Sequence, residues 1–318
     1  MEAIGLTAYG PPEVLQPVEI AEPHATAGQV CIRVRAAGVN PADVMLRDGS
    51  LADWYKDLTP PFVPGMDVAG TLEEIGPDVA EDYPLRLGDD VVAVVDNHGS
   101  RGGYSPYVVV PAASVTAKPA GADYPAAASF LMNALTARCA LDALDLPVGA
   151  TVLVTGAAGA VGGYAVQLAA AAGLTAVAVA SRADEHLVRG FGARKFIDRD
   201  STITEQVREL VPGGVDGLVD AAMLHERITP AVRDGGAMAV LRFWDGNPGR
   251  GITVHPINVR DHVTDHDTIE RLREQAEQRV LALRVAGTFP ADHAPAAHRR
   301  LEQGGVRGRL ILEFPVRP

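Results

Sequence analysis

The first third of the chain carries short apolar runs that are separated by turn-forming residues. The clearest runs are Val30 to Ala36, Val68 to Ile75, Val91 to Val95 and Tyr107 to Pro111. Runs of this length, rich in valine and bounded by Gly, Pro, Asp or Ser, are typical of β-strands. Their close spacing predicts a compact, mostly antiparallel β-barrel.

From Ala126 the pattern changes to helices that alternate with strands. An alanine-rich segment predicts a helix through Leu144. Five apolar strands then follow, at Thr151 to Thr155, Thr175 to Ala180, Lys195 to Ile197, Gly217 to Asp220 and Ala237 to Leu241. This alternation predicts a doubly wound parallel sheet that binds its ligand at the carboxyl ends of the strands.

The last segment contains two helical patterns and one strand. We expect helices at Thr268 to Leu283 and Pro295 to Gln303, and a strand at Arg309 to Phe314. These elements are expected to return to the first domain. The fold class is therefore α/β, with a β-barrel domain formed by residues 1–122 and 263–318 and a Rossmann domain formed by residues 123–262.

A glycine-rich loop follows the first strand of the predicted parallel sheet. We expect Gly156, Gly159 and Gly162 to form a turn and Tyr164 to Ala172 to form the helix behind it. Glycines at this spacing allow the turn, the approach of a pyrophosphate and the packing of helix against strand. The helix N-terminus favours phosphate. The predicted cofactor-binding loop is Gly156, Ala157, Ala158, Gly159, Ala160, Val161 and Gly162.

The end of the second strand indicates which nicotinamide cofactor is used. Sites for NAD commonly place an acidic residue there, about 20 residues after the glycines, but this strand ends in Ser181 and Arg182. An arginine and a hydroxyl can bind a 2′-phosphate. We therefore predict NADPH, with a solvated helix start as the alternative role of Arg182. Leu241 and Phe243, after the fifth strand, are expected to face the cofactor.

Composition excludes several classes of protein. The 318 residues carry a net charge of −12, which disfavours sequence-independent binding to nucleic acid or to an anionic membrane. No apolar stretch reaches the length of a membrane helix and the first residues lack a secretory pattern, so we expect a cytoplasmic protein. Cys31 and Cys139 are too few for a structural zinc lobe and are expected in the core.

Several segments together resemble a known family. They are AAGVNPAD (36–43), PGMDVAG (64–70), LGDDVVAV (87–94), GGYSPYVVVP (102–111), VLVTGAAGAVG (152–162) and AHRRLEQGGVRGRLIL (297–312). In this order they resemble zinc-independent quinone oxidoreductases of the medium-chain dehydrogenase/reductase superfamily. The resemblance implies a GroES-like catalytic domain around a Rossmann domain, NADPH use, hydride transfer and a homodimer.

Zinc-dependent relatives hold a catalytic zinc ion with Cys, His and Cys. The matching positions here are Asn40, Met66 and a position close to Met132. An amide and two thioethers are poor ligands for zinc, which prefers thiolate, imidazole and carboxylate. We therefore expect no metal site.

The resemblance also points to candidate catalytic residues. Asn40 occupies a former metal position and is a candidate hydrogen-bond donor, although Asn-Pro-x-Asp is also ordinary turn chemistry. Thr136 matches a family threonine near the nicotinamide, and its alternative role is to support its helix. The family tyrosine over the substrate is replaced by Leu51, so Tyr55 is a candidate for the lost aromatic or proton donor, with packing as its alternative.

Without zinc, the acceptor must be electrophilic already or be polarised by hydrogen bonds. We therefore predict an NADPH-dependent reductase of quinones or other α,β-unsaturated carbonyls. The alternatives are a biosynthetic enoyl reductase and a non-catalytic NADPH-binding sensor. The predicted partners are a small-molecule quinone or enone and a second copy of the chain.

Overall fold

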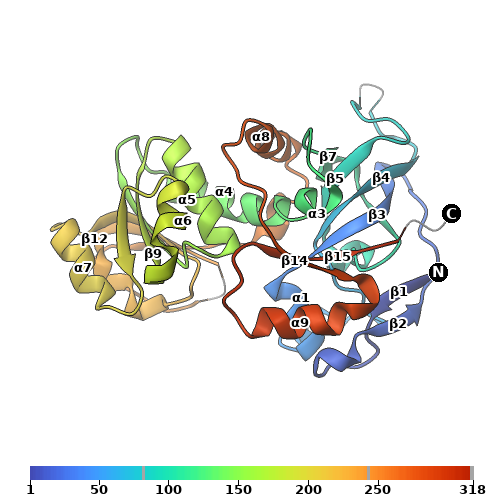
Figure 1. The fold of residues 1–318 in the computed structure, drawn as a ribbon, viewed down its shortest axis with the longest axis horizontal. Helices are drawn as coiled ribbons and strands as arrows, with labels where there is room; N and C mark the ends of the chain where they lie inside the picture. The colour runs from blue at the N-terminus through green and yellow to red at the C-terminus, as the bar shows by residue number, and fades with distance from the viewer. Residues whose placement is uncertain (81–82, 242–243, 316–318) are drawn as a thin grey trace. The chain divides into compact units, whose positions relative to one another are not determined.

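The computed structural model describes residues 1–80, 83–241 and 244–315, which form two compact units (Figure 1). The first unit comprises Met1–Met132, Val263–Glu277 and Leu283–Pro318, and the second comprises Asn133–His262 and Gln278–Ala282. The first boundary between the units falls between Met132 and Asn133, within a helix. The sequence pattern predicts it at residue 122. The short segment 278–282 belongs to the second unit.

The first unit is built on a mostly antiparallel sheet. Its strand order within the described residues is β14-β15-β3-β4-β5-β7, with β6 also paired to β3, and only β14 and β15 run parallel. The strands are β3 (Gln29–Val39), β4 (Asp67–Ile75), β5 (Asp90–Val94), β6 (Tyr107–Pro111), β7 (Val115–Ala117), β14 (Val285–Pro290) and β15 (Arg309–Glu313). A separate hairpin pairs β1 (Glu2–Gly5) with β2 (Gln16–Glu19).

The described part of the first unit also contains helices. They are α1 (Pro41–Asp48), α2 (Asn97–Ser100), α3 (Tyr124–Ala127), α8 (His266–Glu277) and α9 (Ala294–Glu302). Helix α9 packs against β14 and β15, as Figure 1 shows. The core contains Ile32 and Leu72 from neighbouring strands and Ala294 and Ala297 from α9. Burial of these side chains holds the strands and α9 together.

The second unit contains a parallel sheet with the order β10-β9-β8-β11-β12-β13 across the described residues. Its strands are β8 (Thr151–Thr155), β9 (Thr175–Ala180), β10 (Lys195–Asp198), β11 (Val215–Asp220), β12 (Val232–Val240) and β13 (Thr253–Pro256). Its helices are α4 (Leu131–Leu144), α5 (Ala160–Ala171), α6 (Glu185–Gly190) and α7 (Ile203–Leu210). Order reverses between β8 and β11, and open parallel sheets bind ligands at such a switch point. The predicted Rossmann-type domain is confirmed.

Local hydrogen bonds explain where the observed helices differ from the predicted ones. The helix expected from Ala126 to Leu144 is interrupted, because both the backbone N–H and the hydroxyl of Ser129 bond to the carbonyl of Ala126 and close a turn. Helix α8 ends at Glu277 instead of Leu283, and Arg279 has a left-handed φ of 61° just beyond it.

Two further predictions concern the cysteines and membrane-spanning helices. Cys31 and Cys139 are both buried, as predicted, in the first and second units respectively. Within the described ranges, no helix is both long enough and apolar enough to cross a membrane.

Candidate functional site

The glycine-rich loop lies between β8 and α5. Gly156 adopts a left-handed φ of 60°, and Gly159 is the extended residue that precedes the helix. Helix α5 begins at Ala160, four residues before the predicted start at Tyr164. The prediction was wrong here because Gly162 belongs to the first helical turn rather than to the loop. The turn itself spans Gly156 to Gly159, where the N–H of Gly159 donates to the carbonyl of Gly156 over 2.9 Å.

Gly162 allows this turn to lie directly against the helix. A Cβ atom on Gly162 would stand 2.3 Å from the carbonyl oxygen of Gly156 and 3.0 Å from the Cα of Ala157. Only glycine fits, because real Cβ atoms do not approach backbone so closely. The first-turn N–H groups of Val161 and Gly162 have no acceptor within the helix, which is the arrangement that suits a pyrophosphate. The residues therefore fit a dinucleotide.

A buried carboxylate fixes the loop to the neighbouring strand. Asp220, at the carboxyl end of β11, is fully buried and accepts a hydrogen bond of 2.7 Å from the hydroxyl of Thr155. Its other oxygen accepts from the N–H of His225 over 2.8 Å. The Thr155 hydroxyl in turn accepts from the N–H of Ala222. Asp220 thus holds together the ends of β8 and β11, a role that sequence reasoning missed although the residue ended a predicted strand.

The two residues predicted to read the cofactor phosphate follow β9. The Ser181 hydroxyl accepts from the N–H of Ala183 over 3.4 Å, and the Arg182 side chain is 70% exposed. Arg182 Nε lies 3.2 Å from Asp198 Oδ2, and its Nη1 lies 3.4 Å from Glu185 Oε2. The guanidinium therefore has two carboxylate partners. The contact with Asp198 was not predicted from the sequence, because Asp198 comes from the adjacent strand β10.

The segment after β12 carries the other predicted cofactor contacts. Leu241 is half-buried, whereas Phe243 lies outside the described residues. Trp244 donates its indole N–H to Glu226 Oε1 over 2.7 Å and stacks on His225 at 5.7 Å between ring centroids. The indole is thus held by a polar partner and an imidazole.

In the first unit, Asp67 joins two of the three former metal positions. Its Oδ2 accepts from Asn40 Nδ2 over 2.9 Å, and its Oδ1 accepts from the N–H of Met132 over 2.7 Å. Met66 precedes it in the chain, and all four residues are buried. Two of the positions that the resemblance matches to zinc ligands are therefore bonded to one carboxylate, Asn40 through its side-chain amide and Met132 through its backbone.

Asn40 is also the residue that precedes the first turn of helix α1. Its backbone N–H donates to Asp43 Oδ2 over 2.7 Å at the start of α1, while Asp43 Oδ1 accepts from the N–H of Gly65 over 2.7 Å. Burial raises the pKa of Asp43 to about 7 despite these two bonds, and burial also raises the pKa of Asp67. The side chain of Asn40 is then directed to Asp67 rather than to its own turn.

Tyr55 and Thr136 lie in different units. Tyr55 is buried, donates its phenol to Asn97 Oδ1 over 2.7 Å and contacts the ring of His98 edge-on. His98 Nε2 lies 2.7 Å from the carbonyl oxygen of Trp54, so the 97–98 segment is bound to the loop that contains Tyr55. Tyr104 is also fully buried, and its hydroxyl lies 3.1 Å from His298 Nε2. Thr136 is half-buried on α4 in the second unit.

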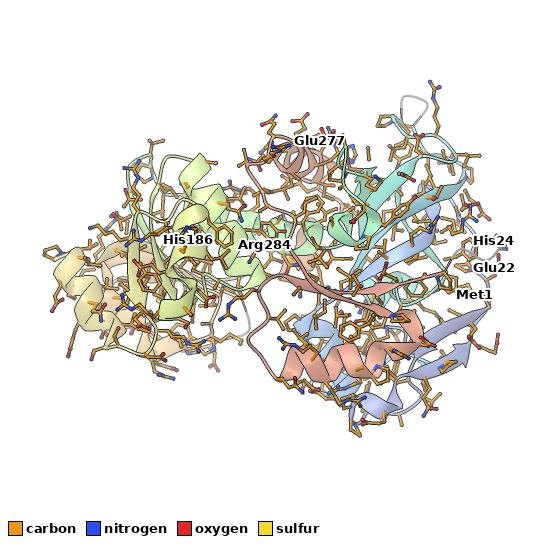
Figure 2. The ribbon with its side chains drawn as sticks, viewed as in Figure 1. Met1, Glu22, His24, His186, Glu277 and Arg284 are labelled. Carbon is orange, nitrogen blue, oxygen red and sulfur yellow. The ribbon has the colours of Figure 1, made fainter. Side chains whose placement is uncertain are left out.

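The histidines of the chain are dispersed. Figure 2 shows His24 at the surface of the first unit and His186 on α6 of the second. His24 pairs with Glu74 over 2.8 Å, and this bond raises the pKa of His24. Among the described residues, no group of three or more His, Cys, Asp or Glu side chains is arranged to hold a metal ion.

Two known domain families match the chain. The alcohol dehydrogenase GroES-like domain matches residues 26–120, and a zinc-binding dehydrogenase family matches residues 191–312. The donor set around Asp67 does not fit the metal that the second description names, because it lacks thiolate and imidazole.

Similar proteins extend over almost the whole chain. A chloroplastic NADPH-dependent alkenal/one oxidoreductase of Arabidopsis thaliana is 28% identical, over 99% of this chain and 80% of its own. A Homo sapiens quinone oxidoreductase is also 28% identical, over 98% of this chain and 97% of its own. A mycobacterial protein solved in complex with NADPH superposes with a TM-score of 0.86 at 26% identity, over 99% of this chain and 100% of that one.

A GroES-like unit joined to a Rossmann-type, nicotinamide-cofactor-binding unit defines an oxidoreductase. The two matched domains and the similar proteins are those of the medium-chain dehydrogenase/reductase superfamily, and the similar proteins include quinone oxidoreductases.

Proposed function

We propose that this protein is an NADPH-dependent, zinc-independent reductase that delivers hydride to a quinone or another α,β-unsaturated carbonyl. The observation that carries the proposal is that Asp67 bonds the side-chain amide of Asn40 and the backbone N–H of Met132, and that Met66 precedes it in the chain. These side chains offer a hydrogen-bond donor but no zinc ligand set. A reductase built this way requires an acceptor that is already electrophilic, and conjugated carbonyls meet that requirement.

Asn40 supplies the donor in this proposal. Its amide nitrogen carries two hydrogens, and one of them is directed at Asp67 Oδ2. The carboxylate holds the amide in place, and the second hydrogen would be donated to the carbonyl oxygen of the acceptor. Because the amide is held before the substrate arrives, little reorganisation is needed when negative charge develops on that oxygen.

The glycine-rich loop would hold the cofactor, which supplies the hydride when bound. Val161 and Gly162 would donate backbone N–H groups to the pyrophosphate, and Ser181 and Arg182 would bind the 2′-phosphate. Thr136 would lie near the nicotinamide, as it does by family resemblance. Leu241, which is half-buried, would provide an apolar contact beside the cofactor.

The location and assembly of the protein are part of the same proposal. We propose a cytoplasmic homodimer in which β13 supplies the contact, because this strand ends the six-stranded order of the described sheet. Light scattering during gel filtration would measure the molar mass directly, and a value near that of one 33.3 kDa chain would contradict the dimer.

The activity is tested with purified, chelator-treated protein and a panel of acceptors. The panel contains a benzoquinone, a naphthoquinone, an enone, an enoyl thioester and an aldehyde, each assayed with NADPH and with NADH. We expect turnover of quinone or enone with NADPH. Turnover restricted to the enoyl thioester would favour a biosynthetic enoyl reductase, and activity that disappears on chelation and returns with zinc would contradict the proposal.

Gly162→Ala tests whether the loop binds the cofactor. The added methyl group would stand 2.3 Å from the carbonyl oxygen of Gly156, so we expect the loop to shift and nucleotide affinity to fall. Gly190→Ala is the matched control, because a Cβ there meets no atom within 4 Å. Calorimetric titration with NADPH measures both variants, and equal affinities would contradict the assignment of the loop.

A further inference from the structure

The strand register brings an acidic residue to the end of β9, where the sequence shows none. Asp198 on β10 is paired in register with Ala180, the last residue of β9. The N–H of Arg199 donates to the carbonyl of Ala180 over 2.9 Å, which closes the ladder at this end. Asp198 therefore lies beside Ser181 and Arg182, the two residues assigned to the 2′-phosphate. In sites specific for NAD, an acidic residue in this region accepts from the ribose 2′-hydroxyl.

The Asp198 carboxylate is both fixed and directed at the arginine. Its side chain is only 18% exposed, and Oδ1 accepts from the N–H of Asp200 over 3.2 Å. Oδ2 accepts from Arg182 Nε over 3.2 Å. A carboxylate held by backbone in this way keeps its position when Arg182 moves. The guanidinium also lies over the ring of Phe196 at 5.5 Å, so three groups of the chain determine its orientation.

Glu185 is a weaker partner of the same arginine. It lies 3.4 Å from Arg182 Nη1, but its Oε1 also lies 2.8 Å from Arg189 Nη2. The charge of Glu185 is thus shared between two arginines. Asp198 is the more effective of the two carboxylates in reducing the positive charge that Arg182 offers to a ligand.

We propose that Asp198 is a specificity-determining residue that competes with the cofactor 2′-phosphate for Arg182 and so limits the preference for NADPH over NADH. The proposal rests on the function proposed above. A 2′-phosphate that binds Arg182 must first displace the Asp198 carboxylate from the guanidinium, whereas a cofactor with a 2′-hydroxyl does not need this displacement. The pair Asp198 and Arg182 therefore permits both cofactors to bind. The negative charge of Asp198 sets the ratio of their affinities.

The test compares Asp198→Asn with a variant of equal charge. Asparagine keeps the size of the side chain and an oxygen for the N–H of Asp200 but removes the charge. Asp200→Asn makes the same change in net charge two residues away, at a side chain that is 78% exposed and pairs with Arg199 instead. Dissociation constants for NADPH and NADH are measured by calorimetric titration at fixed salt, which requires no acceptor and no turnover.

We expect Asp198→Asn to raise the NADPH over NADH affinity ratio about fivefold, which is the scale of one exposed ion pair. Asp200→Asn should leave that ratio within about twofold of the wild type. The effect of Asp198→Asn should vanish in an Arg182→Gln background, because the competition acts through the guanidinium. An unchanged ratio, or an effect that persists without Arg182, would overturn the proposal. Absence of acceptor turnover with intact nucleotide binding would instead count only against the proposed activity.

Discussion

The carboxylate of Asp67 accepts from the side-chain amide of Asn40 over 2.9 Å and from the backbone of Met132 over 2.7 Å. Two segments that are distant in sequence are therefore fixed by one buried side chain. The bond orients the amide that we assign to the acceptor carbonyl. The same bond contributes to folding, since each partner would otherwise be a buried polar group without its hydrogen bond.

Asn40→Ala should reduce both stability and turnover. Removing the amide leaves Asp67 Oδ2 without this donor, at a cost of about 1–3 kcal/mol in the free energy of unfolding. Enone turnover should fall while the affinity for NADPH stays unchanged, because the glycine-rich loop belongs to the second unit. Urea titration, steady-state kinetics and calorimetry measure the three quantities. The predicted loss of stability without any loss of enone turnover would mean that Asn40 has only a helix-capping role.

Asp220→Asn should weaken cofactor binding through the loop that Asp220 supports. The amide nitrogen cannot accept, so either Thr155 or the N–H of His225 loses its acceptor. We expect the dissociation constant for NADPH to rise about tenfold, or 1.4 kcal/mol.

Asp216→Asn is the control for this change. Asp216 accepts from the N–H of Thr151 and from Arg233, at the opposite end of β11. This variant should lose stability but keep its affinity for NADPH. Equal changes in affinity for both variants would indicate a general effect on the fold.

Asp43→Asn should change how stability depends on pH. Burial raises the pKa of Asp43 from 3.8 to about 7, so between these values the folded protein binds more protons than the unfolded chain. This group therefore makes the wild type less stable as pH rises through that interval, by roughly 4 kcal/mol at about 1.4 kcal/mol per pKa unit. In Asp43→Asn the free energy of unfolding should rise more steeply, or fall less, from pH 4 to pH 7. Parallel urea-titration profiles for both proteins would contradict this.

His298→Gln should have the opposite effect on the same profile. Burial, followed by the charge of Arg47, lowers the pKa of His298 from 6.5 to about 3. As pH falls through this interval the unfolded chain takes up a proton that the folded protein does not, so stability is lost. Glutamine keeps an acceptor for the Tyr104 hydroxyl but does not titrate. The variant should lose less stability than the wild type on acidification, and a profile steeper than that of the wild type would contradict the assignment.

Tyr55→Phe should lower stability more than turnover. The phenol donates to buried Asn97, and its loss leaves that acceptor without this bond at a cost of about 1–3 kcal/mol. Because the hydroxyl is engaged by Asn97, we expect the rate of enone reduction to fall by less than about tenfold, below the usual loss for a general acid. A larger loss in kcat with unchanged stability would restore Tyr55 as the proton donor.

Local patterns predicted the strands well and the cofactor environment incompletely. Strands β6, β8 and β9 have the predicted ends, because each is an apolar run bounded by turn residues. The Arg182 contact with Asp198 depends instead on the register between β9 and β10, and Asp67 meets Met132 across 65 residues. Such contacts follow from the packing of whole elements, which no short window of sequence contains.

The place of β15 between β14 and β3 affects the order in which the protein can form during synthesis. The second unit needs few residues beyond 262, whereas the sheet of the first unit needs β15 to bond with β3, some 270 positions earlier. Emerging from the ribosome, β3 and β4 must wait for a strand made near the end of translation. We therefore expect the nucleotide-binding unit to mature first, and the unit that contains Asn40 to complete itself afterwards.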